Sequence, residues 1–248
     1  MPMYDPDHVE YNVTSGHIRI AMESGEMLPA FWAHPNLTTR FPGVVLIHDW
    51  WGVNGIVRRL AHLLAQVGHY VIVPDLFEGQ TARTPTEALS LLEKLGSKAY
   101  NRIDTALSVL ETHHLCNADV AAIGLGMGGS LAFEAAIIRG DLEAAVAYAG
   151  FPQRYLGHFG KSNTPILAFY GTQEQYVPAE AIDRLKQELT TSPLDHEVVM
   201  LDGAEHDIFA DALPEHKREL SRVAWHKTLD FLETYLEGPT QPPERKRY

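Results

Sequence analysis

The chain has 248 residues, of which 45% are hydrophobic and 21% are charged, a composition typical of a globular protein with one large α/β domain or two small ones. Its formal net charge of -12 would repel a polyanion, so we expect no nucleic-acid partner. No apolar run is long enough to cross a bilayer, and Cys116 is the only cysteine, so we expect a cytoplasmic protein with no membrane partner.

The predicted elements alternate between strands and helices. An N-terminal hairpin is expected at 17–22 and 28–35, and a continuous apolar run at 43–50 is typical of a strand buried on both faces. Further strands are expected at 69–77, 118–126, 142–150, 164–171 and 196–203. Helical spacing of apolar residues predicts helices at 55–68, 85–95, 100–115, 129–140, 179–191 and 217–237.

This alternation predicts an α/β fold with a mainly parallel central sheet and helices on both faces. With no internal repeat or low-complexity linker, a single domain over residues 1–240 is the simplest interpretation. The basic segment 241–248 is expected to be a flexible, solvated tail. Ligands of open parallel sheets bind beyond the carboxyl ends of the strands, so the residues that follow each strand are the candidates for chemistry.

The segment 121–136, "AAIGLGMGGSLAFEAA", has the layout of a nucleophile elbow, G-x-S-x-G, with Gly124 and Gly128 as the flanking glycines. The central position, where an attacking serine or cysteine would stand, is Gly126. An ordinary glycine-rich turn between a strand and a helix would give the same letters. A dinucleotide fingerprint needs G-x-G-x-x-G, which this segment lacks, so we expect no nicotinamide site and no other cofactor.

A base and an acid follow two later strands. His206, in "LDGAEHDIF", comes after the last predicted strand, and histidine is the usual general base near neutral pH. Glu174, in "YGTQEQYVP", follows another strand, where a carboxylate can orient the histidine; a solvated loop glutamate is the alternative. The chain order 126, 174, 206 is that of nucleophile, acid and histidine in α/β-hydrolases.

The segment "IHDWWGVN" follows the strand at 43–50 and supplies Asp49. The backbone N–H of Trp50, together with that of Met127 after the elbow, would form an oxyanion hole. Trp51 and Tyr176 are expected to line the substrate pocket, although adjacent tryptophans also serve as core or lid packing.

"VVLIHDWWGVN", "VIVPDLF", "IGLGMGGSLAFEAA", "YGTQEQYVP" and "GAEHDIF" occur in an order and spacing that resemble the dienelactone hydrolase family over residues 15–237. The resemblance implies an α/β-hydrolase fold without a large cap and hydrolysis of dienelactones or other small esters and lactones by a Cys-His-Asp triad. It places Gly126 at the position of the cysteine, Glu174 at that of the aspartate and His206 at that of the histidine. The nucleophile is therefore absent, and the acid is one methylene longer.

Two further positions depart from the best-known members of the family. Asp49 stands where they have a glutamate that touches the resting thiol. Ala210 replaces the arginine that grips the carboxylate of the substrate, so dienelactone itself is not the expected substrate.

Neither of two other side chains is expected to replace the nucleophile. Cys116 precedes its strand and lies at the opposite end of the sheet, about 16 Å away for a five-residue strand. Ser130 lies in the helix after the elbow, where it should face away or pack. Adjacent histidines in "THHL" (112–115) fall in a predicted helix, where neighbouring side chains point apart, so we expect no metal site.

Two interpretations remain for the function. In the first, the protein hydrolyses small esters or lactones weakly, with a water in the space beside Gly126 deprotonated by His206. In the second, it is an inactive descendant that binds a small molecule in the former active site. Gly126→Cys or Gly126→Ser should raise esterase activity only under the first. A separate possibility is that Gly126 was introduced deliberately in place of a natural nucleophile; the fold would then be unchanged, and the protein would be an ordinary covalent hydrolase. The expected partner is a small ester or lactone, and the protein is expected to be a monomer or a small homo-oligomer.

Overall fold

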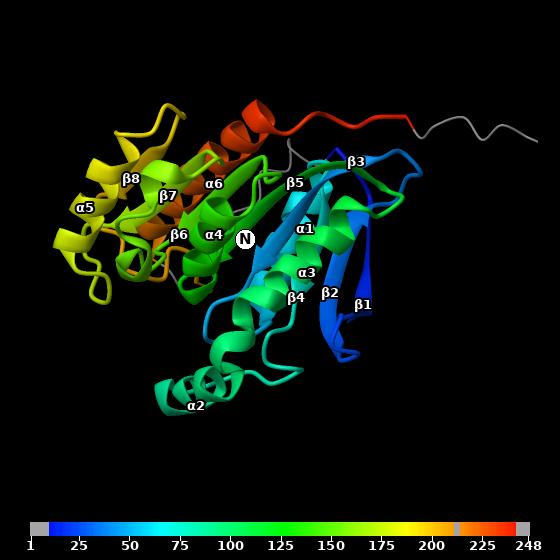
Figure 1. Cartoon of the computed structure of the whole chain (residues 1–248), viewed down its shortest axis with the longest axis horizontal. Helices are drawn as coiled ribbons and strands as arrows, with labels where there is room; N and C mark the ends of the chain where they lie inside the picture. Colours follow the sequence, from blue (N-terminus) through cyan, green and yellow to red (C-terminus); the bar gives the residue numbers. More distant parts are fainter. Residues whose placement is uncertain (1–9, 211–213, 242–248) are drawn as a thin grey trace, which may run out of the picture.

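The computed structural model describes residues 10–210 and 214–241. Its centre is one eight-stranded sheet with the strand order β1-β2-β4-β3-β5-β6-β7-β8 (Figure 1). β1 pairs antiparallel with β2, β2 pairs antiparallel with β4, and all other neighbouring strands are parallel. The strands are β1 (Val13–Ala21), β2 (Met27–Pro35), β3 (Phe41–Ile47), β4 (Tyr70–Pro74), β5 (Cys116–Leu125), β6 (Ala144–Tyr148), β7 (Ile166–Gly171) and β8 (Glu197–Leu201).

Helices cover both faces of this sheet. They are α1 (Gly55–Gln66), α2 (Pro85–Leu95), α3 (Ala99–Glu111), α4 (Met127–Ile138), α5 (Ala179–Leu189) and α6 (Glu215–Tyr235), with short 3-10 turns η2 (Gly96–Lys98), η3 (Gln153–Tyr155) and η4 (Phe159–Lys161). Buried side chains of α1 and α6 share one core with the sheet, and those of α2 to α5 share the other. In Figure 1, α2 projects from the lower end of the molecule, away from the sheet.

Local sequence signals explain where two of these helices begin. The side chain of Asn54 accepts hydrogen bonds from the backbone N–H groups of Ile56 and Val57, which caps α1. Thr84 caps α2 in the same way through Glu87, and Pro85 occupies the first helical turn, where its missing N–H costs nothing.

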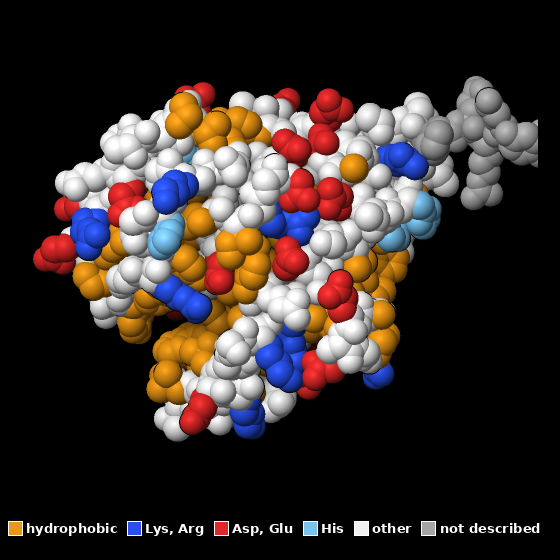
Figure 2. Space-filling model, viewed as in Figure 1, with side chains coloured by type: hydrophobic (Ala, Val, Ile, Leu, Met, Phe, Trp, Pro, Cys, Tyr) orange, Lys and Arg blue, Asp and Glu red, His pale blue; other side chains and the backbone are white. Residues whose placement is uncertain are grey.

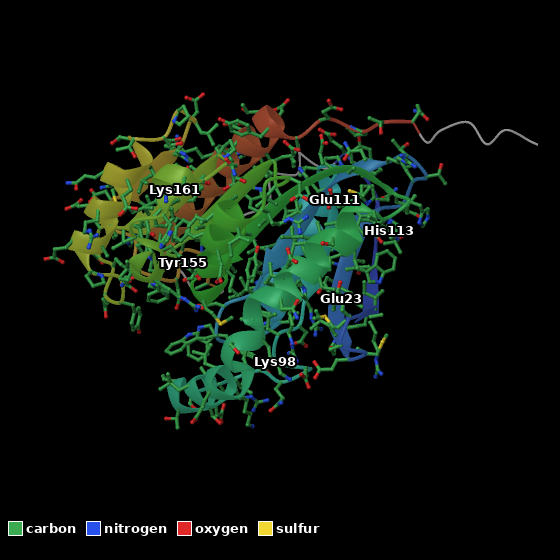
Figure 3. All side chains as sticks on the ribbon, viewed as in Figure 1. Glu23, Lys98, Glu111, His113, Tyr155 and Lys161 are labelled. Atoms are coloured by element: carbon green, nitrogen blue, oxygen red, sulfur yellow. The ribbon has the colours of Figure 1, made fainter. Side chains whose placement is uncertain are left out.

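A buried arginine joins α3 to α4. Arg139, directly after α4, binds Asp104 and Glu111 of α3 and also Asp141, and its side chain is only 8% exposed. Figure 3 labels Glu111 at the end of α3. Because the three carboxylates are themselves partly exposed, this network fixes the relative position of the helices more than it adds to stability.

The expected α/β fold with a mainly parallel sheet is confirmed, and so is the N-terminal hairpin. The helix expected at 100–115 is too long, because α3 ends at Glu111. His113 and His114 lie beyond it, with their ring centroids 4.4 Å apart, so the expectation that these two side chains point apart within a helix is wrong. Among the described residues, no group of three or more His, Cys, Asp or Glu side chains could hold a metal ion.

Within the described ranges, no helix is long and apolar enough to span a membrane. The basic residues 242–248 of the expected tail lie outside the described part of the chain. Just before them, Thr240 pairs with Arg40 in an isolated antiparallel bridge.

Candidate active site

The segments after β7 and β8 bring an acid and a base together. Nδ1 of His206 lies 2.9 Å from each carboxylate oxygen of Glu174. Both side chains are shielded, with exposed fractions of 11% for His206 and 4% for Glu174. Oε1 of Glu174 also accepts hydrogen bonds from the backbone N–H groups of Tyr176, at 2.7 Å, and Val177, at 3.2 Å. Because the carboxylate only accepts, Nδ1 donates and Nε2 of His206 is left as a proton acceptor.

The two groups shift each other's pKa in opposite directions. Burial lowers the pKa of His206, but the hydrogen bond and the charge of Glu174, with the charge of Asp49, outweigh burial and raise it above its usual value. Burial raises the pKa of Glu174, but the hydrogen bond from His206 and those from the backbone outweigh it and lower the pKa. The imidazole of His206 therefore holds its second proton more firmly than a free histidine side chain in water does.

The turn between β5 and α4 has the conformation of a nucleophile elbow. Gly126 adopts φ +50° and ψ -111°, in the left-handed region that side-chain-bearing residues rarely adopt. A Cβ at Gly128 would collide with the backbone of β3, at the carbonyl group of Ile47. The two glycines thus allow the sharp turn and the close approach of α4 to the sheet.

Asp49 occupies the centre of the site. Its Oδ1 accepts hydrogen bonds from the backbone N–H groups of Trp50, at 2.7 Å, and Met127, at 2.8 Å. A Cβ built on Gly126 would lie 2.6 Å from Asp49 Oδ2, and closer still to Oδ1. The carboxylate therefore fills the volume that a side chain at position 126 would need.

This arrangement corrects one expectation. The N–H groups of Trp50 and Met127 do converge on one point, but the atom they hold is an oxygen of Asp49. The expectation of an empty space beside Gly126 that holds a water is wrong for this conformation, because the carboxylate of Asp49 fills that space. The pKa of Asp49 is raised by burial, which its two backbone hydrogen bonds and the nearby His206 only partly offset.

A histidine that the sequence analysis did not single out positions Asp49. The ring of His48 is fully buried, with Nε2 accepting a hydrogen bond from Leu76 N at 3.0 Å. Since Nε2 accepts, Nδ1 carries the proton and donates to Asp49 O at 2.7 Å. Burial lowers the pKa of His48, which keeps the ring neutral. His48 thus joins the segment after β3 to the segment after β4.

Two cavities flank Asp49 and His206, and these two residues line both. The larger has a volume of about 430 Å³ and a mostly apolar lining that includes Trp50, Trp51, Leu89, Leu92, Phe151 and Tyr176. Figure 2 shows hydrophobic side chains beside the hollow where α2 meets the rest of the molecule. The smaller, of about 90 Å³, is lined by Trp51, Asn54, Tyr148 and Ala210 among others.

The expected pocket residues Trp51 and Tyr176 thus both line the larger cavity, where Tyr176 is 58% exposed. The ring of His206 packs 5.0 Å from that of Tyr176 and 5.5 Å from that of Phe151. Phe151 comes from the loop after β6, where Tyr155, labelled in Figure 3, donates a hydrogen bond to Glu134 of α4. This contact ties the loop that carries Phe151 to the helix after the elbow.

The two alternative nucleophiles are placed differently from each other. Cys116 is the first residue of β5, at the end of the strand away from Gly126, and burial raises its pKa to about 11. Ser130 lines the larger cavity. Its hydroxyl accepts a hydrogen bond from Phe151 N at 2.9 Å and lies 3.5 Å from Gly126 O, so it packs against the elbow.

Sequence reasoning also missed Leu89 and Leu92 of α2. The buried stripe of α2 consists of Ala88, Leu91 and Leu95, and Leu89 lies off it with 58% exposure. A second apolar position beside the core stripe of a helix was the available signal, because a solvated face would be polar.

The chain is similar to known proteins over most of its length. The sequence model of the "Dienelactone hydrolase family" matches residues 28–236. The chain belongs to the dienelactone hydrolase family. Among its relatives in this family, a Yersinia pestis protein provisionally named a carboxymethylenebutenolidase is 26% identical over 236 residues, which is 89% of this chain and 88% of the relative.

Solved structures with the same fold include a provisionally assigned dienelactone hydrolase from Klebsiella pneumoniae, with a TM-score of 0.79 and 24% identity over 90% of this chain and all of that one. A dienelactone hydrolase-like promiscuous phosphotriesterase from metagenomic libraries also has a TM-score of 0.79, with 20% identity over 91% of this chain and 99% of that one. Both structures match at least 90% of this chain, so they share its α/β-hydrolase fold.

Proposed function

We propose that this member of the dienelactone hydrolase family hydrolyses small, uncharged esters or lactones by activating water directly. The observation that carries the proposal is the pairing of His206 Nδ1 with both oxygens of Glu174, at 2.9 Å, beside an elbow that has no side-chain nucleophile. The pair orients the imidazole so that Nε2 can take a proton from water as the water attacks the ester carbonyl.

The lining of the cavities supports an uncharged substrate. Of the described residues, no lysine or arginine lines either cavity. The position of Ala210, at which the resemblance implies a carboxylate-binding arginine in the best-known members, lines the smaller cavity with a methyl group. A cavity of about 430 Å³ with aromatic and leucine walls has the size and character of a small-molecule site.

Ester hydrolysis needs the oxyanion hole, and Asp49 Oδ1 occupies it. The carboxylate must therefore rotate out before an ester carbonyl can bind to the N–H groups of Trp50 and Met127. Each such donor contributes about 10²–10³-fold to the rate when it is free to hold the developing oxyanion. For a resting site closed by Asp49 we therefore expect ester hydrolysis to be weak. The occupied hole also favours the alternative that the protein binds a ligand without turning it over.

The test is steady-state and pre-steady-state hydrolysis of p-nitrophenyl acetate. We expect turnover without a burst, no acetyl adduct on the protein by mass spectrometry, and a loss of about 10²–10⁴-fold in His206→Gln. His158→Gln, at an exposed histidine outside both cavities, is the matched control. A stoichiometric acetyl-enzyme contradicts direct attack by water. If the unaltered protein turns over p-nitrophenyl acetate no faster than His206→Gln does, the result instead favours the binding function.

A further inference from the structure

Asp49 has a feature that the proposed ester hydrolysis does not use. Oδ1 is held by two backbone N–H groups, whereas Oδ2 has no hydrogen-bond donor among the described residues. Asp49 also lines both cavities, so its side chain faces the space in which a substrate would lie. A carboxylate with one oxygen fixed by backbone donors and the other facing a cavity is oriented for nucleophilic attack by the free oxygen.

The occupied hole decides what kind of carbon such a nucleophile can attack. Attack on an ester carbonyl creates an oxyanion on the substrate, but the donors that would hold it are already bound to Asp49 Oδ1. Displacement at a saturated carbon creates no such oxyanion. In this conformation the site therefore favours alkyl over acyl electrophiles.

We propose that Asp49 is the nucleophile of a second activity, the hydrolysis of small apolar alkyl halides at saturated carbon. In the first step a lone pair of Oδ2 forms a bond to the carbon, and the carbon–halogen bond breaks with its electron pair leaving as halide. The product is an alkyl ester of Asp49. The carboxylate occupies the volume left by the missing side chain at position 126, and the alkyl chain of the ester would extend into the larger cavity that Asp49 lines.

The second step uses the groups that surround Asp49. His206 Nε2 takes a proton from water, and the water oxygen bonds to Cγ of the Asp49 ester. The negative charge develops on Oδ1, which the N–H groups of Trp50 and Met127 already hold at 2.7 and 2.8 Å. The Cγ–O bond to the alkyl group then breaks, the alkoxide takes the proton from His206, and Asp49, left as the carboxylic acid, releases its proton to water to recover the carboxylate. One water and one alkyl halide give one alcohol and one hydrogen halide.

The larger cavity fits the proposed substrates. Trp50, Leu92 and Phe151 give it apolar walls next to Asp49. An unbranched bromoalkane buries its chain there without leaving a polar group unpaired. The ester function proposed above shares His206 with this activity but not the nucleophile, so the two can fail independently.

The test uses 1-bromohexane as the probe and bromide release as the assay. We expect bromide release by the unaltered protein and a fall to the protein-free rate in Asp49→Asn. In H₂¹⁸O under single-turnover conditions, we expect ¹⁸O in the peptide that contains Asp49 and none in the hexanol, because the alcohol leaves with the original Oδ2. In His206→Gln we expect a hexyl ester to accumulate on Asp49.

Asp207, a second carboxylate that lines the same cavities, is the internal control for unspecific alkylation. Bromide release that is absent or unaffected by Asp49→Asn, ¹⁸O in the hexanol of the first turnover, or a hexyl group on Asp207 instead of Asp49 overturns the proposal. Hydrolysis of p-nitrophenyl acetate is measured on the same samples. If the unaltered protein releases bromide but does not hydrolyse p-nitrophenyl acetate, the ester function is contradicted. If it hydrolyses p-nitrophenyl acetate but releases no bromide, the alkyl-halide activity is contradicted.

Discussion

A side chain at position 126 should displace Asp49, and the structure contains a matched control for the effect. Gly126 and Gly96 have nearly the same backbone conformation, with φ +50° and +53° and ψ -111° and -133°. A Cβ at Gly96 meets nothing within 4 Å, whereas one at Gly126 meets the Asp49 carboxylate. Gly96→Ala therefore reports backbone strain alone, about 1–3 kcal/mol, and Gly126→Ala reports strain plus the displacement.

The free-energy cost of the displacement comes mainly from lost hydrogen bonds. The steric cost is small, because the carboxylate is the free end of a side chain that can rotate away. Two bonds to a charged group are lost, each about 1.5–3 kcal/mol, and water replaces them in part. We therefore expect Gly126→Ala to be less stable than Gly96→Ala by about 1–3 kcal/mol, which at this chain length is a difference of roughly 2–12 °C in Tm.

Urea and thermal unfolding of the two variants, alone and with Asp49→Ala, measure this difference as a double-mutant cycle. In the Asp49→Ala background, Gly126→Ala should cost no more than Gly96→Ala, because the colliding carboxylate is gone. Equal costs of the two glycine substitutions in the unaltered background, or no coupling to position 49, would refute the proposed occupancy. The expectation from the sequence that Gly126→Ser alone raises esterase activity changes accordingly: the gain should need Asp49→Ala as well.

Three further predictions concern the site. Glu174→Gln should lower kcat/KM for p-nitrophenyl acetate by about 10²–10⁴-fold, because the amide no longer stabilises the protonated imidazole; unchanged kinetics would contradict its orienting role. The kcat/KM of the unaltered protein should rise with pH as His206 loses its proton, and the midpoint should lie above the usual 6.5 because Glu174 and Asp49 raise the pKa of His206. In Glu174→Gln the midpoint should move to lower pH. A rate that does not change from pH 5 to 9 would exclude His206 as the base. Leu89→Ser should raise KM for p-nitrophenyl hexanoate, because Leu89 lines the larger cavity, and should change stability by no more than about 0.5 kcal/mol, because Leu89 is 58% exposed. The control Leu37→Ser, at a residue that is 51% exposed and lies outside both cavities, should leave this KM unchanged.

The fold could be predicted from the sequence because its signals are local. Apolar runs of strand length, such as that in β3, alternate with helical spacing, and only a mainly parallel sheet with helices on both faces buries all of them. The proximity of Glu174 and His206 follows from the same rule, because the carboxyl ends of parallel strands meet at one edge of the sheet.

The state of Asp49 could not be predicted in this way. Its position in the oxyanion hole depends on a side-chain rotamer and on the missing Cβ of Gly126, and neither follows from the order of strands. The roles of Leu89 and His48 depend on tertiary contacts with segments far along the chain, for example the bond from Leu76 N to the ring of His48.

The rate of p-nitrophenyl acetate hydrolysis by Asp49→Ala tests most directly whether the carboxylate closes the oxyanion hole. Removing it frees the N–H groups of Trp50 and Met127, so kcat/KM should rise by about 10–100-fold over the unaltered protein. An unchanged or lower kcat/KM in a folded Asp49→Ala variant would contradict the account, because the hole would then be open at rest or the carboxylate would be needed for ester hydrolysis.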